Sequence, residues 1–125
     1  MRGKQFKYRI QVAIVGCIFL IVLVINTSFA TPKKHTIFFG GSNGFHYVPD
    51  FLEVIVGDTI EWSGDFTKYG LESVSIPSGA ISFKVDSVLT FQYVVRKQGN
   101  YSYRNPIYFS IGMQGTILVD TVKYG

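Results

Sequence analysis

The chain has 125 residues, which is room for one domain. Its formal net charge is +4, from 12 Lys and Arg against 8 Asp and Glu. Four of the basic residues, Arg2, Lys4, Lys7 and Arg9, precede the first apolar run, and 12 less these 4 leaves 8 basic residues against 8 acidic ones. The balanced charge and the lack of a basic stripe leave no argument for nucleic-acid binding, so we expect no nucleic-acid partner.

Residues 1–30 have the three parts of a secretory signal peptide: a basic start, an apolar run over Ile10–Ile25, and small residues up to Ala30. We therefore expect cleavage after Ala30 and export. The alternative is an uncleaved membrane anchor, although the apolar run is shorter than the roughly 20 residues that a spanning helix needs. Cys17, the only cysteine, lies in this leader, so the exported domain over residues 31–125 would have neither a disulfide nor a thiolate.

From residue 31 onward the hydrophobic pattern has the period of two that is typical of β-strands. Turn residues recur every few positions, and no stretch has the pattern of an amphipathic helix. These observations predict an all-β domain, a β-sandwich. The expected strands are "HTIFFGG" at 35–41, "FLEVIVGDTIEW" at 51–62 with a break at Gly57, "SVSIP" at 73–77, "AISFKV" at 80–85, "LTFQYVV" at 89–95, "GNYSY" at 99–103 and "GTILVD" at 115–120.

Three segments share a specific pattern: "FHYVPDFLEVIVGDTIEW", "YGLESVSIPSGA" and "GNYSYRNPIYFSIGMQGTILV". The chain resembles the cupredoxins, the blue-copper domains of plastocyanin and its relatives, and the middle segment is similar to one found in bacterial secreted members. The resemblance covers nearly all of residues 31–125. It implies a Greek-key β-sandwich that works in the periplasm or outside the cell. The last segment keeps the spacing of six framework residues: Gly99, Tyr101, Tyr103, Gly112, Met113 and Gly115.

The resemblance also implies four copper ligands, a thiolate, two imidazoles and a thioether, and this chain keeps only one of them. The cysteine position is Asn105, the second histidine position is Tyr108, and Met113 is the retained thioether. The first histidine position is Tyr69 or, by a different count along the chain, Glu72. An amide cannot replace a thiolate, and a phenol with a pKa near about 10 stays protonated at neutral pH. We therefore expect a degenerate copper site and no cofactor.

The rival interpretation is a copper-binding electron-transfer protein with an off-pattern site. Such a site would use His46, because the resemblance places its segment near the copper end, together with Met113. A lone histidine is more often structural than a metal ligand, and the sequence offers His46 few other residues with which to bind copper.

We expect His35, at the start of the exported domain, to be exposed.

The sequence contains no Ser-His-Asp, Cys-His or paired-carboxylate arrangement, so we do not expect an enzyme. The segment between Asn105 and Met113 is apolar for a surface loop, with Ile107 and Phe109 in it. In cupredoxins this loop and the segment around Phe45 form a hydrophobic patch that docks redox partners. We expect a binding or structural module in which Tyr69 and Tyr108 fill the space of the metal and its imidazoles. Phe45, Ile107 and Phe109 either meet a protein partner or help to fill the same space, and the sequence favours neither alternative.

Overall fold

The structure is a computed structural model that describes residues 31–121, and the chain divides into two units, Met1–Thr31 and Pro32–Gly125. The predicted signal peptide lies outside the described residues and stays a prediction. Within residues 31–121, no helix is long and apolar enough to cross a membrane. That part of the chain is built from β-strands and two short 3₁₀ helices, η1 (Gly41–Asn43) and η2 (Phe109–Ile111).

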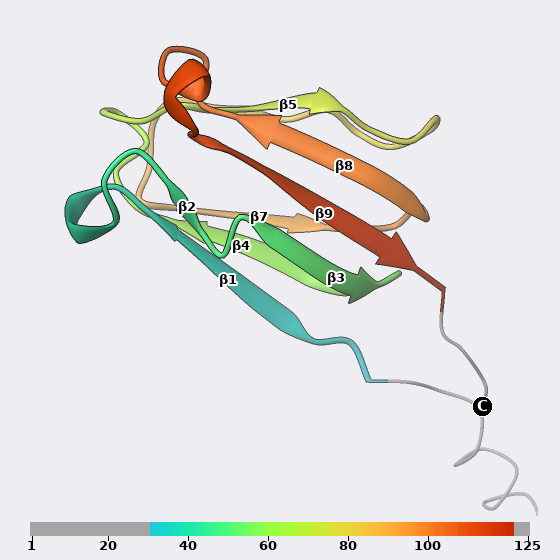
Figure 1. The fold of residues 1–125 in the computed structure, drawn as a ribbon. Helices are drawn as coiled ribbons and strands as arrows, with labels where there is room; N and C mark the ends of the chain where they lie inside the picture. The colour runs from blue at the N-terminus through green and yellow to red at the C-terminus, as the bar shows by residue number, and fades with distance from the viewer. Residues whose placement is uncertain (1–30, 122–125) are drawn as a thin grey trace, which may run out of the picture. The chain divides into compact units, whose positions relative to one another are not determined.

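Two β-sheets form the two layers of the domain (Figure 1). The first sheet has the strand order β2-β1-β4-β7, and the second has the order β3-β9-β8-β5-β6. The bounds of the first sheet are β2 (Tyr47–Val48), β1 (Lys34–Phe39), β4 (Thr59–Ser63) and β7 (Thr90–Val94). Those of the second are β3 (Phe51–Ile55), β9 (Gln114–Asp120), β8 (Gly99–Arg104), β5 (Leu71–Ser75) and β6 (Lys84–Val85).

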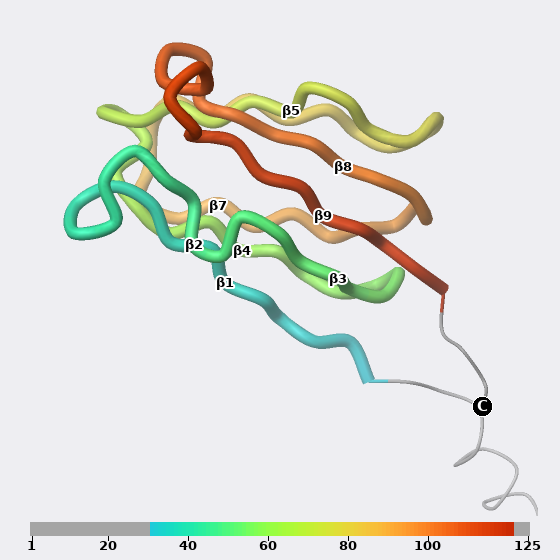
Figure 2. The backbone as a smooth tube through the Cα atoms, in the orientation of Figure 1, coloured from blue at the N-terminus to red at the C-terminus, as the bar shows by residue number. Residues whose placement is uncertain are grey.

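The chain passes repeatedly from one sheet to the other, as the tube in Figure 2 shows. β1 pairs with β4 in parallel, and β3 pairs with β9 in parallel, while the other neighbours are antiparallel. These crossovers produce two mixed sheets that enclose one core. The predicted all-β sandwich is confirmed.

Aromatic side chains dominate the core between the sheets. The predicted alternation holds, because Ile60 and Trp62 of β4 are fully buried, as are Tyr101 and Tyr103 of β8. The Tyr103 ring packs edge-on against Trp62, with ring centroids 5.2 Å apart. The Tyr101 hydroxyl donates a 2.7 Å hydrogen bond to the Lys97 carbonyl, an arrangement known as a tyrosine corner. Each buried large side chain stabilises the fold by about 1.5–3 kcal/mol relative to leaving it exposed.

The prediction for the middle of the chain was less accurate. The expected strand at 80–85 is a strand only at β6, although Phe83 is buried in the core beside it. The expected strand at 73–77 begins earlier, at Leu71, and ends at Ser75. Pro77 has no N–H to donate to a neighbouring strand, which explains why this strand cannot extend as far as predicted.

The expectation that His35 is simply exposed was wrong. Its Nε2 atom lies 3.0 Å from Oδ2 of Asp58, which follows the turn between β3 and β4. Asp58 is only 5% exposed, and it also accepts hydrogen bonds from the N–H groups of Lys33 (2.9 Å) and Ile55 (3.2 Å). This one carboxylate therefore fastens the first residues of the domain to the β3–β4 turn.

Asp58→Asn should make stability less dependent on pH at the acidic end. Burial raises the pKa of Asp58, but the hydrogen bonds from Lys33, His35 and Ile55 outweigh it and hold the pKa below its usual value. A lowered pKa contributes stability above the unfolded-state pKa of about 3.9, and this contribution is lost as the pH falls through the lower folded-state pKa. We expect Asp58→Asn to lower the free energy of unfolding by about 1–3 kcal/mol at pH 7, and by less as the pH drops below about 4.

Urea unfolding at several pH values measures this difference. Asp86→Asn is the matched control, because Asp86 is exposed and its side chain forms no hydrogen bond within residues 31–121. A cost for Asp58→Asn that stays constant from neutral to acidic pH would contradict the prediction.

Candidate functional site at the loop end

The loop between β8 and β9 and the loop that carries η1 lie at the same end of the sandwich (Figure 1). The first of these runs from Asn105 to Met113 and contains η2. The second follows β1 and includes Phe45. Both segments carry residues that the resemblance assigned to the copper end, so the structure brings the predicted site residues to one place.

Asn105 is the buried centre of the β8–β9 loop, with 1% of its surface exposed. Its Nδ2 donates a 2.8 Å hydrogen bond to the carbonyl of Gly70, just before β5. Its Oδ1 accepts hydrogen bonds from the backbone N–H groups of Ile107 (2.8 Å) and Tyr108 (2.7 Å). The amide thus uses both its donor and its acceptor side, and it joins the loop to the neighbouring strand.

Backbone hydrogen bonds close the same loop. The Asn105 N–H donates to the Met113 carbonyl at 3.0 Å, and the Met113 N–H donates to the Tyr108 carbonyl at 3.2 Å. Gly112, at the end of η2, has a φ of +110°, a left-handed conformation that favours glycine. The Met113 side chain that follows is fully buried in the core.

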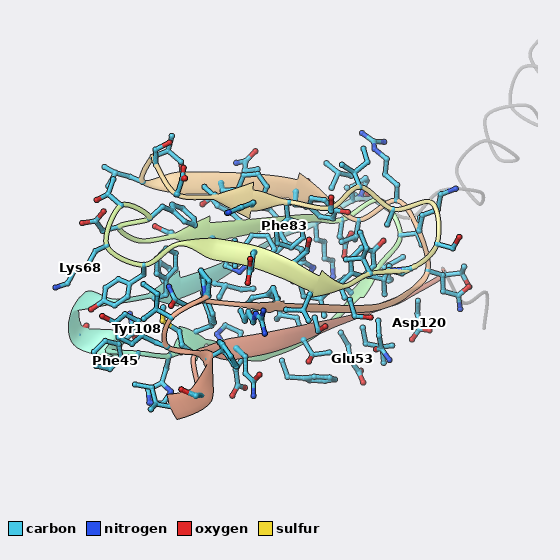
Figure 3. All side chains as sticks on the ribbon, turned by 90° about the horizontal axis from the view of Figure 1, so that it is seen from above. Phe45, Glu53, Lys68, Phe83, Tyr108 and Asp120 are labelled. Carbon is cyan, nitrogen blue, oxygen red and sulfur yellow. The ribbon has the colours of Figure 1, made fainter. Side chains whose placement is uncertain are left out.

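Three aromatic rings pack together beneath and beside this loop. The ring centroids of Tyr69 and Tyr108 are 6.1 Å apart, and Phe45 lies 4.5 Å from Tyr108 and 5.9 Å from Tyr69. Figure 3 shows Phe45 and Tyr108 next to one another, at the end of the domain away from Asp120. Tyr69 is buried and Tyr108 is half-buried. A Cβ atom on Gly40 would come within 2.8 Å of the Tyr69 ring, so this glycine leaves room for the ring.

Tyr69, rather than Glu72, lies in this ring cluster. The Glu72 carboxylate instead accepts a 2.9 Å hydrogen bond from Nε of Arg104, its cross-strand neighbour on β8. The Arg104 guanidinium also lies 4.3 Å from the centroid of the Phe109 ring. Sequence reasoning missed Arg104, because no local pattern gives the register between β5 and β8 that pairs it with Glu72.

The off-pattern histidine is exposed, and the retained methionine is not. A Cβ atom on Gly112 would lie 3.5 Å from the His46 ring, so His46 sits against the loop near η2. Met113 is buried in the core behind it. Among residues 31–121, no group of three or more His, Cys, Asp or Glu side chains is placed to hold a metal ion.

The outer surface of the loop end is apolar. Phe45 is 40% exposed, Ile107 is 70% exposed and Phe109 is 37% exposed. We call these three residues the loop-end patch. Ile111, on η2, is also exposed and extends it. The structure therefore places all three predicted surface residues on the outside, at the same end as the Tyr69–Tyr108 cluster.

Comparison with known proteins agrees with this architecture. No protein-family model and no curated protein matches the sequence. Among solved structures, pseudoazurin from Hyphomicrobium denitrificans matches with a TM-score of 0.59 and 22% identity, over 69% of this chain and 74% of that one. Oxidised plastocyanin from Dryopteris crassirhizoma matches with a TM-score of 0.53 and 24% identity, over 69% of this chain and 100% of that one.

A third match is an amicyanin variant, M98Q, solved with Cu(I), at a TM-score of 0.54 and 18% identity, over 70% of this chain and 82% of that one. Pseudoazurin, plastocyanin and amicyanin are cupredoxins. At identities this low, the similarity shows a common fold. It does not show the chemistry of the site, which has to be argued from the residues of this chain. The described part of this chain has the cupredoxin-like fold.

Proposed function

We propose that this protein is an exported cupredoxin-like module that has lost the ligands for type 1 copper, and that it acts by binding rather than by catalysis. The observation that carries the proposal is the hydrogen bonding of Asn105. At the position that the resemblance assigns to the copper thiolate, a buried amide bonds to Gly70, Ile107 and Tyr108. Its polar atoms are engaged in holding the backbone of the loop.

The other donors at the loop end do not fit type 1 copper either. Tyr69 and Tyr108 are phenols that pack against aromatic neighbours, and they supply neither the thiolate nor the imidazoles of a blue-copper site. Thiolate and imidazole carry the bonding in blue-copper sites, and the axial thioether is weak. Met113 alone therefore supplies too little affinity, and His46 would be its only imidazole partner at this end.

The copper part of the proposal predicts that the purified protein, incubated with Cu(II) and desalted, retains far less than one copper per chain. It should also lack the intense visible absorption of a copper–thiolate bond, because the only cysteine of the sequence is Cys17 in the expected leader. The measurement is metal analysis together with a visible spectrum.

A positive control is the triple variant Tyr69→His, Asn105→Cys, Tyr108→His, which restores the family's ligand types and should gain copper. Stoichiometric copper in the unmodified protein would contradict the proposal, and loss of that copper in His46→Ala would favour the off-pattern site.

The binding part of the proposal rests on the loop-end patch. Ile107 and Phe109 lie on a loop that is fixed from within by Asn105, and Phe45 lies on the neighbouring loop after β1. Together the three form an apolar surface of the kind that protein partners use. Rings that filled the core would be buried, as Tyr69 is. The 70% exposure of Ile107 therefore favours docking over packing for this residue. Phe45 packs on Tyr108 and Phe109 packs on Arg104, and each also presents an exposed edge to the patch.

If the loop-end patch serves docking, polar substitutions there should leave the fold intact. We expect Ile107→Ser to change the free energy of unfolding by less than about 1 kcal/mol, because the Ile107 side chain is 70% exposed. Tyr69→Ala should cost about 3–5 kcal/mol, as truncation of a buried aromatic does. Denaturant unfolding of both variants measures this, and a large cost for Ile107→Ser would show that this residue holds the fold instead.

A further inference from the structure

The outer edge of β7 is an unpaired strand edge within the described residues. β7 pairs with β4 on one side and ends the first sheet on the other. In an antiparallel pair, successive residues direct their N–H and C=O groups alternately toward the partner strand and away from it. The Val95 N–H bonds to the Asp58 carbonyl on the β4 side, at 3.0 Å. Counting back from Val95, the backbone groups of Thr90, Gln92 and Val94 therefore point to the free edge.

A groove runs along this edge. Two adjoining hollows, of about 110 Å³ and about 450 Å³, share Ile81, Tyr93, Val94 and Arg96 in their walls. One wall is β7, and the other is the segment that leads into β6. The Tyr93 hydroxyl donates a 2.7 Å hydrogen bond to the Ile81 carbonyl and so fixes the spacing of the two walls. The Ile81 side chain is 74% exposed and offers an apolar surface in the groove.

The charged side chains that line this groove all have the same sign. Lys84 lies in the wall beside the start of β7, and Arg96 and Lys97 follow the end of β7. No Asp or Glu is among the lining residues of either hollow. All three basic side chains are exposed, and within residues 31–121 none of them forms an ion pair. The groove is therefore apolar along its length and basic at both ends.

We propose that the β7 edge binds an extended, acidic peptide segment of another protein, which adds a fifth strand to the first sheet. The outward N–H and C=O groups of Gln92 and its neighbours would supply the main-chain hydrogen bonds, and the groove would take alternate side chains. β7 spans roughly 17 Å at about 3.3 Å per residue, so a segment of five or six residues with acidic residues at its ends fits between the basic groups.

The basic side chains favour an acidic peptide, rather than a second copy of the chain, as the partner of the β7 edge. Two copies that paired edge to edge through β7 would bring Lys84, Arg96 and Lys97 of each copy toward the same groove. Like charges brought together across strands are destabilising, whereas opposite charges stabilise the pair. An acidic partner neutralises these side chains and satisfies the strand edge at the same time.

Fluorescence anisotropy with two labelled peptides tests the proposal on the purified protein. The probe is Glu-Glu-Val-Thr-Val-Thr-Val-Glu-Glu, and its control has Lys in place of each Glu. We expect saturable binding of the acidic peptide and binding at least about tenfold weaker for the basic one, with the difference shrinking at high salt. No saturable binding of the acidic peptide up to about 1 mM would overturn the proposal, as would equal affinity for both peptides.

Two variants locate the binding on β7. Gln92→Pro removes an outward N–H and no backbone hydrogen bond to β4, although it also removes the 2.7 Å side-chain hydrogen bond from Gln92 to Glu61. It should weaken binding at least about tenfold and keep the β spectrum in circular dichroism. Arg96→Glu with Lys97→Glu should reverse the preference between the two peptides, whereas Lys68→Glu, a matched charge reversal at the loop end (Figure 3), should not. If Gln92→Pro fails to fold, hydrogen exchange in the unmodified protein tests the placement on β7. Bound acidic peptide should slow the exchange of the Gln92 and Val94 N–H groups. An unchanged affinity in the Arg96 and Lys97 variant would contradict this placement.

Discussion

Three hydrogen bonds of one buried amide hold the loop end of this domain together. The Asn105 side chain connects the turn after β8 to the backbone before β5, which lies 35 residues earlier in the chain. It also caps the N–H groups of Ile107 and Tyr108, which would otherwise have no partner inside the loop. A buried amide whose oxygen and nitrogen are both hydrogen-bonded is stabilising, and leaving one of its partners without a bond costs about 1–3 kcal/mol. Backbone hydrogen bonds, such as the one from the Met113 N–H to the Tyr108 carbonyl, close the rest of the loop.

The packing around the loop follows from the amide. Because the Tyr108 backbone is held by Asn105, its ring is placed against Phe45 and near Tyr69, where it closes the end of the core. Ile107 is bonded to the same oxygen through its N–H, and its side chain is consequently left on the outside. One interaction thus separates the residues that fill the end of the sandwich from those that form the loop-end patch. In our account, hydrogen bonds and ring packing give the loop the rigidity that a metal gives to copper-binding cupredoxins.

The fold and the residues that meet at the loop end were largely predictable from the sequence, and the hydrogen bonds that connect them were not. The period of two over β4, β8 and β9 predicted which side chains are buried, because alternation in a strand fixes the face of each residue. The framework spacing around Asn105 and Met113 identified the loop, and the aromatic substitutions predicted the approach of Tyr69 and Tyr108. The hydrogen bond from the Tyr108 backbone N–H to Asn105 was not predicted, because it depends on the course of the loop backbone.

What escaped prediction depends on strand register. The Gly70 carbonyl meets Asn105, and Arg104 meets Glu72, only because β5 and β8 are neighbours in one particular alignment. The His35–Asp58 pair depends in the same way on the parallel pairing of β1 with β4. No local pattern in the sequence encodes these alignments. The strand expected at 80–85 was also too long, because Phe83 is buried as a strand residue would be while only Lys84 and Val85 pair with β5.

The central claim is that Asn105 holds the loop without a metal, and hydrogen exchange of individual backbone N–H groups in metal-free, chelator-treated protein tests it most directly. The Ile107 and Tyr108 N–H groups, bonded to Asn105, should exchange slowly. The Ser110 N–H, which makes no hydrogen bond within residues 31–121, should exchange fast and serve as the internal control. Slow exchange at Ile107 and Tyr108 that becomes fast in Asn105→Ala is the predicted result. Fast exchange at both residues in the unmodified protein, slowed by added copper, would contradict the account.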